Sequence, residues 1–427
     1  MRRILLVMWS LSVIARAAAY AQPDTIRITL PEAEQRFLRN NLQLIAARYN
    51  IDAAEAAVTQ AKLWPNPNIQ IEQNVYNQFT RRYFDFTREG NTEVQLQQLF
   101  LLAGKRDKQI TLAEINARRT EHGFYDLLRA VRLELRSDMY DLYFLQRSIA
   151  FYDESSRVIR STVASVEHVY EKRSVLLADV LRLKALLFSL ENERLGLMNQ
   201  IADIEGDLHI LLRDTTGTVT YYVPVISGES LDSMAVDSLG LSRLVALAKE
   251  RRPDFMIADA NVRFEETNLA LQRAMAVPDV TLGGRWSRAG SYIPEYFAVT
   301  AAVDLPLFNR NQGNILVSEK TLEANRALRE NAERTVEREV TVSFQKALQT
   351  DRLYRASDRK FPGEYRTLVD GMVQNYLKRN MTIIEFTDFY ESYRTAMLQI
   401  NQLQDDRADA FETLNYATGS DLYNQKP

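Results

Sequence analysis

The sequence of 427 residues contains no cysteine, only 15 glycines and 11 prolines, and no excess of positive charge. Without cysteine there is no disulfide, no thiol catalysis, no cysteine-ligated zinc and no lipid attached to an N-terminal cysteine. Because glycine and proline interrupt regular structure, their scarcity indicates long uninterrupted elements, mainly helices. The 53 Lys and Arg are balanced by 56 Asp and Glu. This balance argues against a nucleic-acid partner, which requires a basic surface.

Residues 1–21 have the pattern of a secretory signal peptide. Two arginines precede an apolar stretch of about a dozen residues, and an A-x-A cleavage site follows at Ala19 to Ala21. We expect cleavage between Ala21 and Gln22 and export of the mature chain. A membrane anchor is the alternative, but the stretch is short and Arg16 interrupts it. Since no later apolar run reaches about 18 residues, the mature chain could enter a membrane only through strands.

The chain repeats its own pattern. Residues 30–71 and 241–282 each begin with an amphipathic helical segment, stop at a proline and continue as an alternating segment, at an offset of 211 positions. Residues 170–181 and 376–387 share Tyr-x-Lys-Arg and an acid six residues after the arginine. We therefore predict a signal peptide, a first repeat, an equatorial connector, a second repeat and a tail. Their predicted bounds are 1–21, 22–213, 214–240, 241–418 and 419–427.

Four segments alternate apolar and polar residues with a period of two, which is typical of strands with one buried face. These predicted strands are residues 68–77, 92–100, 279–287 and 295–305. Two hairpins on a soluble core would explain the alternation. The alternative is a membrane barrel, with apolar side chains toward lipid and polar side chains toward a water-filled lumen. Four strands cannot close such a barrel, and an open edge would leave backbone groups unpaired in lipid, so we expect three chains to form a twelve-stranded barrel.

The aromatic loop 77–91 suits the membrane interface and an extracellular rim.

Two long helical hairpins are also expected. From Gly104 to Tyr170 there is no proline, which allows about 100 Å of helix at 1.5 Å per residue. The return helix covers 176–212.

The second half repeats this pattern from 313 to 376 and from 382 to 418, and its Pro362-Gly363 should kink or break the long helix. A soluble coiled-coil rod would explain these helices but not the strands. The predicted fold is therefore mainly α, with long antiparallel coiled-coil helices, a transmembrane β part and an internal two-fold repeat.

Three strings resemble those of the TolC family of outer-membrane efflux ducts. Asp304–Asn314 (DLPLFNRNQGN) resembles the family motif that leads from barrel into helix, and Gln98–Arg106 (QLFLLAGKR) is similar to its first-repeat counterpart. The leading helix that ends in WPNPNIQIE is also characteristic. The resemblance covers nearly the whole mature chain. It is greatest with the CzcC/CusC-like branch, whose ducts serve metal-efflux pumps.

The resemblance implies a homotrimer in the outer membrane of a Gram-negative bacterium, with a helical tunnel extending into the periplasm. Residues 214–240 and the C-terminus would form an equatorial belt. The implied partners are a periplasmic adaptor protein, an inner-membrane transporter, which we expect to be of the RND type, and outer-membrane lipid. The implied function is a passive exit duct for metal cations or drugs, with no enzymatic activity and no cofactor. A type I protein secretion duct shares this fold and remains an alternative, as does a soluble periplasmic coiled-coil scaffold.

The resemblance also assigns roles to two helix-hairpin tips, 170–181 and 376–388, which would close the tunnel and dock the adaptor. Glu385 and Asp388 match the paired acidic residues of the family, and their i, i+3 spacing puts both on one helix face. In a trimer they would form two acidic rings that favour cations; an ordinary solvated acidic face is the alternative. The adaptor-docking candidates are Tyr170, Lys172, Arg173, Asp179, Arg182, Tyr376, Lys378 and Arg379.

One departure from the family concerns the turns. Glycine is frequent where Arg173 and Arg379 stand here, which indicates another tip conformation or a charged contact with the adaptor.

Metal binding and catalysis have little support. His122, His168 and His209 have no partner at helical spacing, and the sequence contains no P-loop, nucleophile elbow or HExxH motif.

Overall fold

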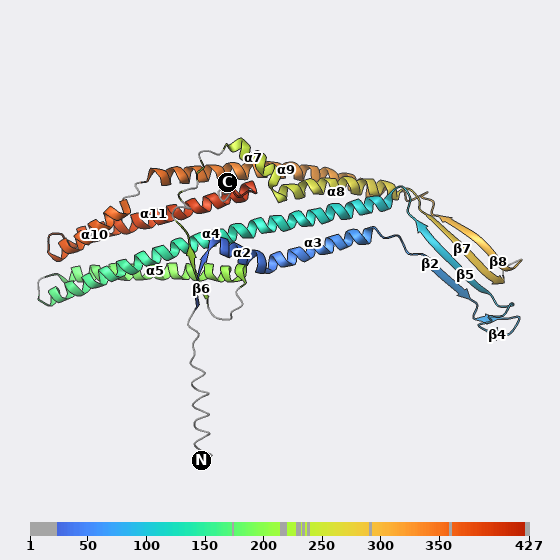
Figure 1. Cartoon of the computed structure of the whole chain (residues 1–427), viewed down its shortest axis with the longest axis horizontal. Coiled ribbons are helices and arrows are strands. Elements are labelled where there is room, and N and C mark those ends of the chain that lie inside the picture. Colours follow the sequence, from blue (N-terminus) through green and yellow to red (C-terminus); the bar gives the residue numbers. More distant parts are fainter. Residues whose placement is uncertain are drawn as a thin grey trace, which may run out of the picture. The chain divides into compact units, whose positions relative to one another are not determined.

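The computed structural model describes residues 24–172, 175–213, 220–227, 232, 235–236, 240–289, 293–357 and 361–422 (Figure 1). The predicted signal peptide and its cleavage site therefore lie outside the described residues, as does part of the predicted connector. The chain forms two compact units, each built from several stretches of sequence. Unit 1 comprises Met1–Ile45, Leu127–Arg251 and Glu337–Pro427, and unit 2 comprises Ala46–Asp126 and Arg252–Val336.

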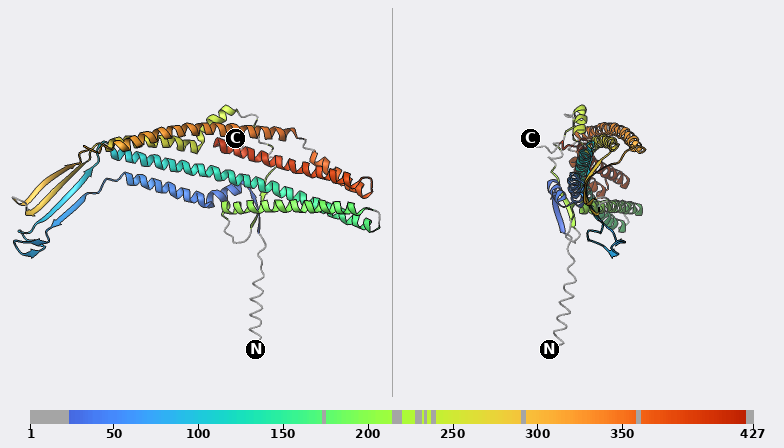
Figure 2. Two further views of the ribbon diagram at one scale, coloured as in Figure 1. Left: turned by 180° about the vertical axis from the view of Figure 1, so that it is seen from behind. Right: turned by 90° about the vertical axis from the view of Figure 1, so that its right-hand side faces the viewer.

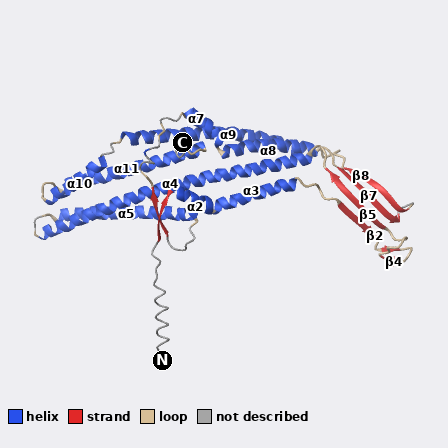
Figure 3. Ribbon diagram, in the orientation of Figure 1, coloured by secondary structure: helices blue, strands red, loops and turns tan. Residues whose placement is uncertain are grey.

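Unit 2 contains an antiparallel sheet of four strands in the order β2-β5-β7-β8 (Figure 3). Each strand lies within a segment whose alternation of apolar and polar residues predicted it, to within a few residues at each end. The helices α3, α4, α8 and α9 all join the strands at the same end of this sheet, because α3 and α8 lead into β2 and β7, whereas α4 and α9 follow β5 and β8. The strands are β2 (Asn68–Gln73), β5 (Thr92–Phe100), β7 (Val280–Ala289) and β8 (Pro294–Val303).

The strand predicted over 68–77 is shorter than expected, which corrects the sequence-based boundary. β2 ends at Gln73, and the chain then forms a small hairpin from β3 (Tyr76–Asn77) and β4 (Arg82–Tyr83). Alternation alone could not reveal this end, because hydrogen bonds within the loop that follows redirect the backbone. The Phe84 amide donates to the Val75 carbonyl at 2.9 Å.

Each of the two leading helices predicted from the sequence is divided in two. The first forms α2 (Leu30–Asn40) and α3 (Leu42–Ala61), and the second forms α7 (Leu241–Arg251) and α8 (Pro253–Met275). At the first break the Asn41 side chain accepts from the Leu44 amide at 3.1 Å, so it caps α3. At the second break Pro253 occupies the first turn of α8, a position where its missing N–H costs nothing. Asn41 and Arg252 are 211 positions apart, the offset at which the sequence repeats.

The long helices follow the distribution of glycine and proline. α4 (Lys105–Glu171) is a single helix of 67 residues. It returns as α5 (Leu177–Leu212), and in unit 1 the two lie side by side in both views (Figures 1 and 2). In the second half the predicted break is confirmed, because α9 (Gln312–Ala356) ends before α10 (Phe361–Leu377), and α11 (Ile383–Thr418) is the return helix. None of the described helices is both long and apolar enough to span a lipid bilayer.

The core of unit 1 is made by these helices and by a short parallel sheet. β1 (Asp24–Thr29) pairs with β6 (Thr220–Val225), which lies in the segment predicted as a connector. Buried charges are paired, as burial requires. The Arg136 guanidinium donates to Glu34 at 2.6 Å, to Glu412 at 2.8 Å and to Asp421 at 2.9 Å.

Candidate functional site

The sheet of unit 2 has one continuous apolar face. Because side chains of directly opposite residues in an antiparallel ladder point to the same side, the register defines rows that cross all four strands. One row is Ile71, Val94, Trp286 and Phe297, and the next is Ile69, Leu96, Gly284 and Val299. These side chains are largely unburied in the single chain, with Val299 at 90% exposure. A surface of this kind requires a partner or a nonaqueous environment.

The opposite face of the sheet is polar. The rows between the apolar ones contain Gln70, Gln95 and Arg285, and next to them Glu93. Arg285 and Glu93 form an ion pair at 3.4 Å. The sheet is thus amphipathic over β2, β5 and β7, with two chemically distinct faces, and this confirms the alternation detected in these segments.

The strings that resemble family motifs form the joints between strands and helices. In the first joint the Lys105 ammonium is buried and donates to the Asp279 carboxylate at 2.7 Å and to the Val277 carbonyl at 2.6 Å. In the second joint the Asn311 backbone is left-handed, with φ of 59°, and its side chain donates to the Gln272 carbonyl at 2.8 Å. These contacts fix the direction in which each long helix leaves the sheet.

At the tip between α10 and α11, Glu385 caps the N-terminus of α11. Thr382 is the N-cap of α11, and the two side chains form a capping box in which the Thr382 amide donates to the Glu385 carboxylate at 2.8 Å. These hydrogen bonds from the Thr382 backbone and hydroxyl lower the pKa of Glu385. Asp388 follows one turn later and is exposed. The predicted acidic pair therefore lies on one face at the start of α11, but Glu385 also stabilises the helix end.

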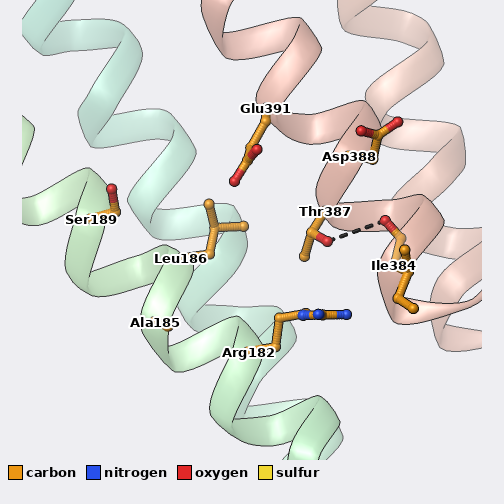
Figure 4. A pocket seen from close by; sticks show the side chains of 8 residues that line it. All are labelled: Arg182, Ala185, Leu186, Ser189, Ile384, Thr387, Asp388 and Glu391. Atoms are coloured by element: carbon orange, nitrogen blue, oxygen red, sulfur yellow. Dashed lines mark hydrogen bonds between the residues drawn. The ribbon is translucent and has the colours of Figure 1, made fainter.

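Asp388 lines a groove of about 420 Å³ between α5 and α11 (Figure 4). α11 contributes Asp388 and Glu391 to this groove, and α5 contributes Arg182 across from them. The structure thus brings together Asp388 and Arg182, which hold matching positions in the two sequence repeats. The groove is not purely acidic, because the guanidinium offsets part of the negative charge.

The remaining predicted tip residues are not equivalent to one another. Tyr376 is buried and stacks on Phe386, with ring centroids 5.0 Å apart, whereas Tyr170 is exposed. Asp179, Arg379 and Tyr376 line a second, mainly apolar cavity of about 310 Å³. Lys172 and Lys378 lie on exposed turns, and Arg173 lies outside the described residues.

An acidic cluster between α4 and α11 was not predicted from the sequence. Asp141 on α4 faces Asp405 on α11, and burial raises the pKa of both carboxyls. Burial and neighbouring carboxylates raise the pKa of Asp405 to about 8 and that of Asp138 to about 7. The i, i+3 spacing of Asp138 and Asp141 indicates that both carboxyls lie on one face of α4. It does not indicate that this face packs against α11. Among the described residues, no group of three or more His, Asp or Glu has the arrangement of a metal site.

The amphipathic sheet and the long helical hairpins can now be compared with known proteins. A protein-family model described as "Outer membrane efflux protein" matches residues 244–420. This match agrees with the resemblance to TolC-type ducts and covers the second half of the chain.

Two curated relatives match parts of the chain. The cobalt-zinc-cadmium resistance protein CzcC of Cupriavidus metallidurans is 22% identical over 290 residues, covering 67% of this chain and 65% of CzcC. The probable outer membrane lipoprotein SilC of Salmonella typhimurium is 27% identical over 308 residues, covering 66% of this chain and 62% of SilC. The match therefore spans slightly less than two thirds of either relative.

Solved structures show the same fold over almost the whole chain. CusC superposes with a TM-score of 0.75 at 16% identity, over 95% of this chain and 96% of CusC. A membrane protein from Pseudomonas aeruginosa gives a TM-score of 0.76 at 17% identity, over 91% of this chain and 92% of the other. The predicted fold, mainly α with a β part, is confirmed.

Proposed function

We propose that this protein is the outer-membrane exit duct of a tripartite efflux system and that it conducts its cargo passively out of the periplasm. The apolar face that runs across all four strands carries the proposal. Such a face is stable in contact with lipid, and the opposite polar face suits a water-filled lumen. No catalytic step and no cofactor belong to this proposal.

The two free edges of the sheet support a trimer. β2 and β8 are the edge strands, and in lipid their unpaired backbone groups would each cost several kcal/mol. Because the four strands alternate in direction, β8 of one copy and β2 of the next would pair antiparallel. Three copies would give the twelve-stranded barrel expected from the family resemblance.

The proposal is tested by fractionating cells that express the full chain. We expect the protein in the outer-membrane fraction, migrating as a trimer that heating converts to monomer in a detergent gel. Recovery as a monomer from the periplasmic fraction would instead identify a soluble coiled-coil scaffold. N-terminal sequencing of the same material tests cleavage between Ala21 and Gln22.

We further propose that the cargo is a metal cation. The name of CzcC refers to cobalt, zinc and cadmium resistance, and the proposed acidic pair at the α11 tip would favour cations. Deletion of the gene should increase susceptibility to one of these metals, and the intact gene should restore resistance. Increased susceptibility to drugs alone would indicate a drug duct, and failure to secrete a protein encoded beside it would indicate a type I secretion duct.

The role proposed for Glu385 and Asp388 can be tested without disrupting the helix cap. Glutamine is compatible with a capping box, so Glu385→Gln with Asp388→Asn removes both charges while it retains the local structure. We expect reduced cation selectivity in planar bilayers. Asp52→Asn with Glu55→Gln removes the same charge from an exposed i, i+3 pair on α3 and is the matched control. Equal selectivity in both variants would contradict the acidic-ring assignment.

The two tips are also the proposed docking surface for a periplasmic adaptor, with an inner-membrane transporter beyond it. Tyr170, Lys172, Arg173, Asp179, Arg182, Tyr376, Lys378 and Arg379 remain the candidates. Charge reversal at exposed Lys378 and Arg379 should reduce crosslinking to an adaptor encoded beside the gene. Unchanged crosslinking would place the docking surface elsewhere.

A further inference from the structure

The loop that joins β2 and β5, residues 74–91, is built around one carboxylate, and we call it the 74–91 loop. Asp85 is only 2% exposed. It accepts from the Thr80 hydroxyl at 2.5 Å, from the Thr87 hydroxyl at 2.6 Å and from the Asn77 amide group at 3.1 Å. These hydrogen bonds lower the pKa of Asp85 to about 2. The carboxylate therefore stays ionised and organises the loop without a cationic partner among the described residues.

Close packing and strained backbone also indicate a single defined loop conformation. A Cβ atom on Gly90 would lie 1.6 Å from the Asp85 carbonyl oxygen, so only glycine fits there. Arg81 and Phe84 have left-handed backbones, with φ of 53° and 48°. Such conformations persist in non-glycine residues only where the surroundings enforce them. The loop is thus preorganised.

The 74–91 loop packs on the apolar side of the sheet. Gln73 lies two residues after Ile71 in β2, so its side chain is on the apolar face, and it donates to the Asp85 carbonyl at 3.2 Å. Arg288 is two residues after Trp286 in β7, and its guanidinium lies 5.5 Å from the Trp286 ring centroid. This guanidinium donates to the Phe86 carbonyl. Two side chains of the apolar face therefore hold the loop.

The surface that the 74–91 loop presents is both aromatic and basic. Phe79 is 97% exposed, and Tyr83 and Phe86 are also exposed. The arginines of the loop are at positions 81, 82 and 88, are exposed, and form no ion pair among the residues that the structure describes. Glu89 is the one exposed acid within the loop, so the exposed charge is net positive.

We propose that the 74–91 loop binds the phosphorylated headgroups of outer-leaflet lipid. The inference rests on the proposed function, which puts the sheet in the outer membrane with its apolar face toward lipid. Since the helices join the opposite end of the sheet, the loop would then lie at the outer leaflet. Aromatic rings favour the headgroup level, and guanidinium groups bind phosphate oxygens in pairs.

The experiment measures binding of fluorescent lipid A to the purified full-length protein in detergent. Unlabelled lipid A should compete, and phosphatidylcholine or inorganic phosphate should not. Arg82→Gln should weaken binding about fivefold, which corresponds to the about 1 kcal/mol that one basic residue contributes near an anionic membrane surface. Combining it with Arg81→Gln and Arg88→Gln should weaken binding more than about 50-fold by the same rule.

Two further variants distinguish a built site from general electrostatic attraction. Arg310→Gln removes one exposed charge at the helix end of the sheet and should leave binding unchanged. Gly90→Ala leaves every charge in place but displaces the Asp85 backbone, so it should weaken binding. The proposal is overturned if the triple variant binds as the wild type does, or if Arg310→Gln and Arg82→Gln have equal effects.

Conductance in planar phosphatidylcholine bilayers separates this inference from the proposed function. If wild type and triple variant both insert and conduct while lipid A binding is unaffected, only the lipid site is rejected. If the wild type neither inserts nor conducts, the channel function fails and the lipid site fails with it.

Discussion

The tip between α4 and α5 exposes Tyr170, whereas the tip between α10 and α11 buries the matching Tyr376 against Phe386. The two tips share a Tyr-x-Lys-Arg pattern and one buried hydrophobic cluster, to which the second tip contributes the larger aromatic rings. Phe386 contacts Tyr390 as well, and both rings are almost fully buried. The position that matches Phe386 in the first tip is occupied by Val180, which is also buried but far smaller.

The N-terminal caps of α5 and α11 also favour a more stable second tip. α11 begins with the Thr382–Glu385 capping box, whereas the N-cap of α5 is Leu176, whose side chain forms no cap and is 71% exposed. The two N-cap backbones are nearly identical, with φ and ψ of −78° and 158° at Thr382 and −80° and 146° at Leu176. The difference therefore arises from side chains. It indicates that the first tip opens at a lower free energy than the second.

Phe386→Ala should have the largest effect on this difference. Removing a buried aromatic ring leaves a cavity and costs about 3 to 5 kcal/mol. Val180→Ala should cost only about 1.5 kcal/mol, from about 0.8 kcal/mol per buried methylene. Hydrogen exchange of the full-length protein, followed by mass spectrometry of tip peptides, measures both. Equal losses at the two tips would contradict the comparison.

Tyr376→Phe should stabilise the second tip. The Tyr376 hydroxyl is buried without a hydrogen-bond partner among the described residues, and leaving such a group unsatisfied costs roughly 1 to 2 kcal/mol. The control is Tyr170→Phe, where an exposed hydroxyl is lost and no change is expected. Slower exchange at the second tip alone supports the prediction, and faster exchange there would mean that the hydroxyl has a partner in the assembled protein.

Exchanging the N-caps should make the stabilities of the two tips more similar. Thr382→Ala removes the capping box and should cost about 1 kcal/mol. Leu176→Thr supplies a hydroxyl acceptor where the backbone already has N-cap geometry, and should stabilise α5 by a similar or smaller amount. Protection of amides in the first turn of each helix reports the effect. If Leu176→Thr has no effect, cap chemistry does not limit the first tip.

Arg379→Gly should have the smallest effect. Arg379 has φ of 64°, a left-handed conformation that costs a non-glycine residue about 1 to 2 kcal/mol. Glycine removes this strain but increases the entropy of the unfolded chain, so the net gain should be about 0.5 kcal/mol. A loss of stability would show that the Arg379 side chain makes contacts that offset its backbone strain.

Much of the architecture was predictable because local sequence patterns report burial. Alternation in residues 92–100 predicted β5, and the absence of proline after Gly104 predicted the uninterrupted α4. The break just before Pro362-Gly363 could be expected from backbone chemistry alone. Glu385 and Asp388 could be assigned to one helix face by spacing, although spacing does not show that Glu385 also caps α11.

Contacts between distant segments decided the rest. The end of β2 at Gln73 depends on a loop organised by Asp85. The pKa of Asp138 depends partly on a carboxylate of α5, and the pKa of Asp405 depends partly on a carboxylate of α4. The pattern Tyr-x-Lys-Arg occurs at both tips, but only packing against Phe386 buries one tyrosine. The sequence by itself thus determined the order and type of elements, because hydrophobic periodicity and breaker residues act locally. The tertiary structure decided burial and the pKa shifts of the buried carboxyls, because these depend on neighbours that are far apart along the chain.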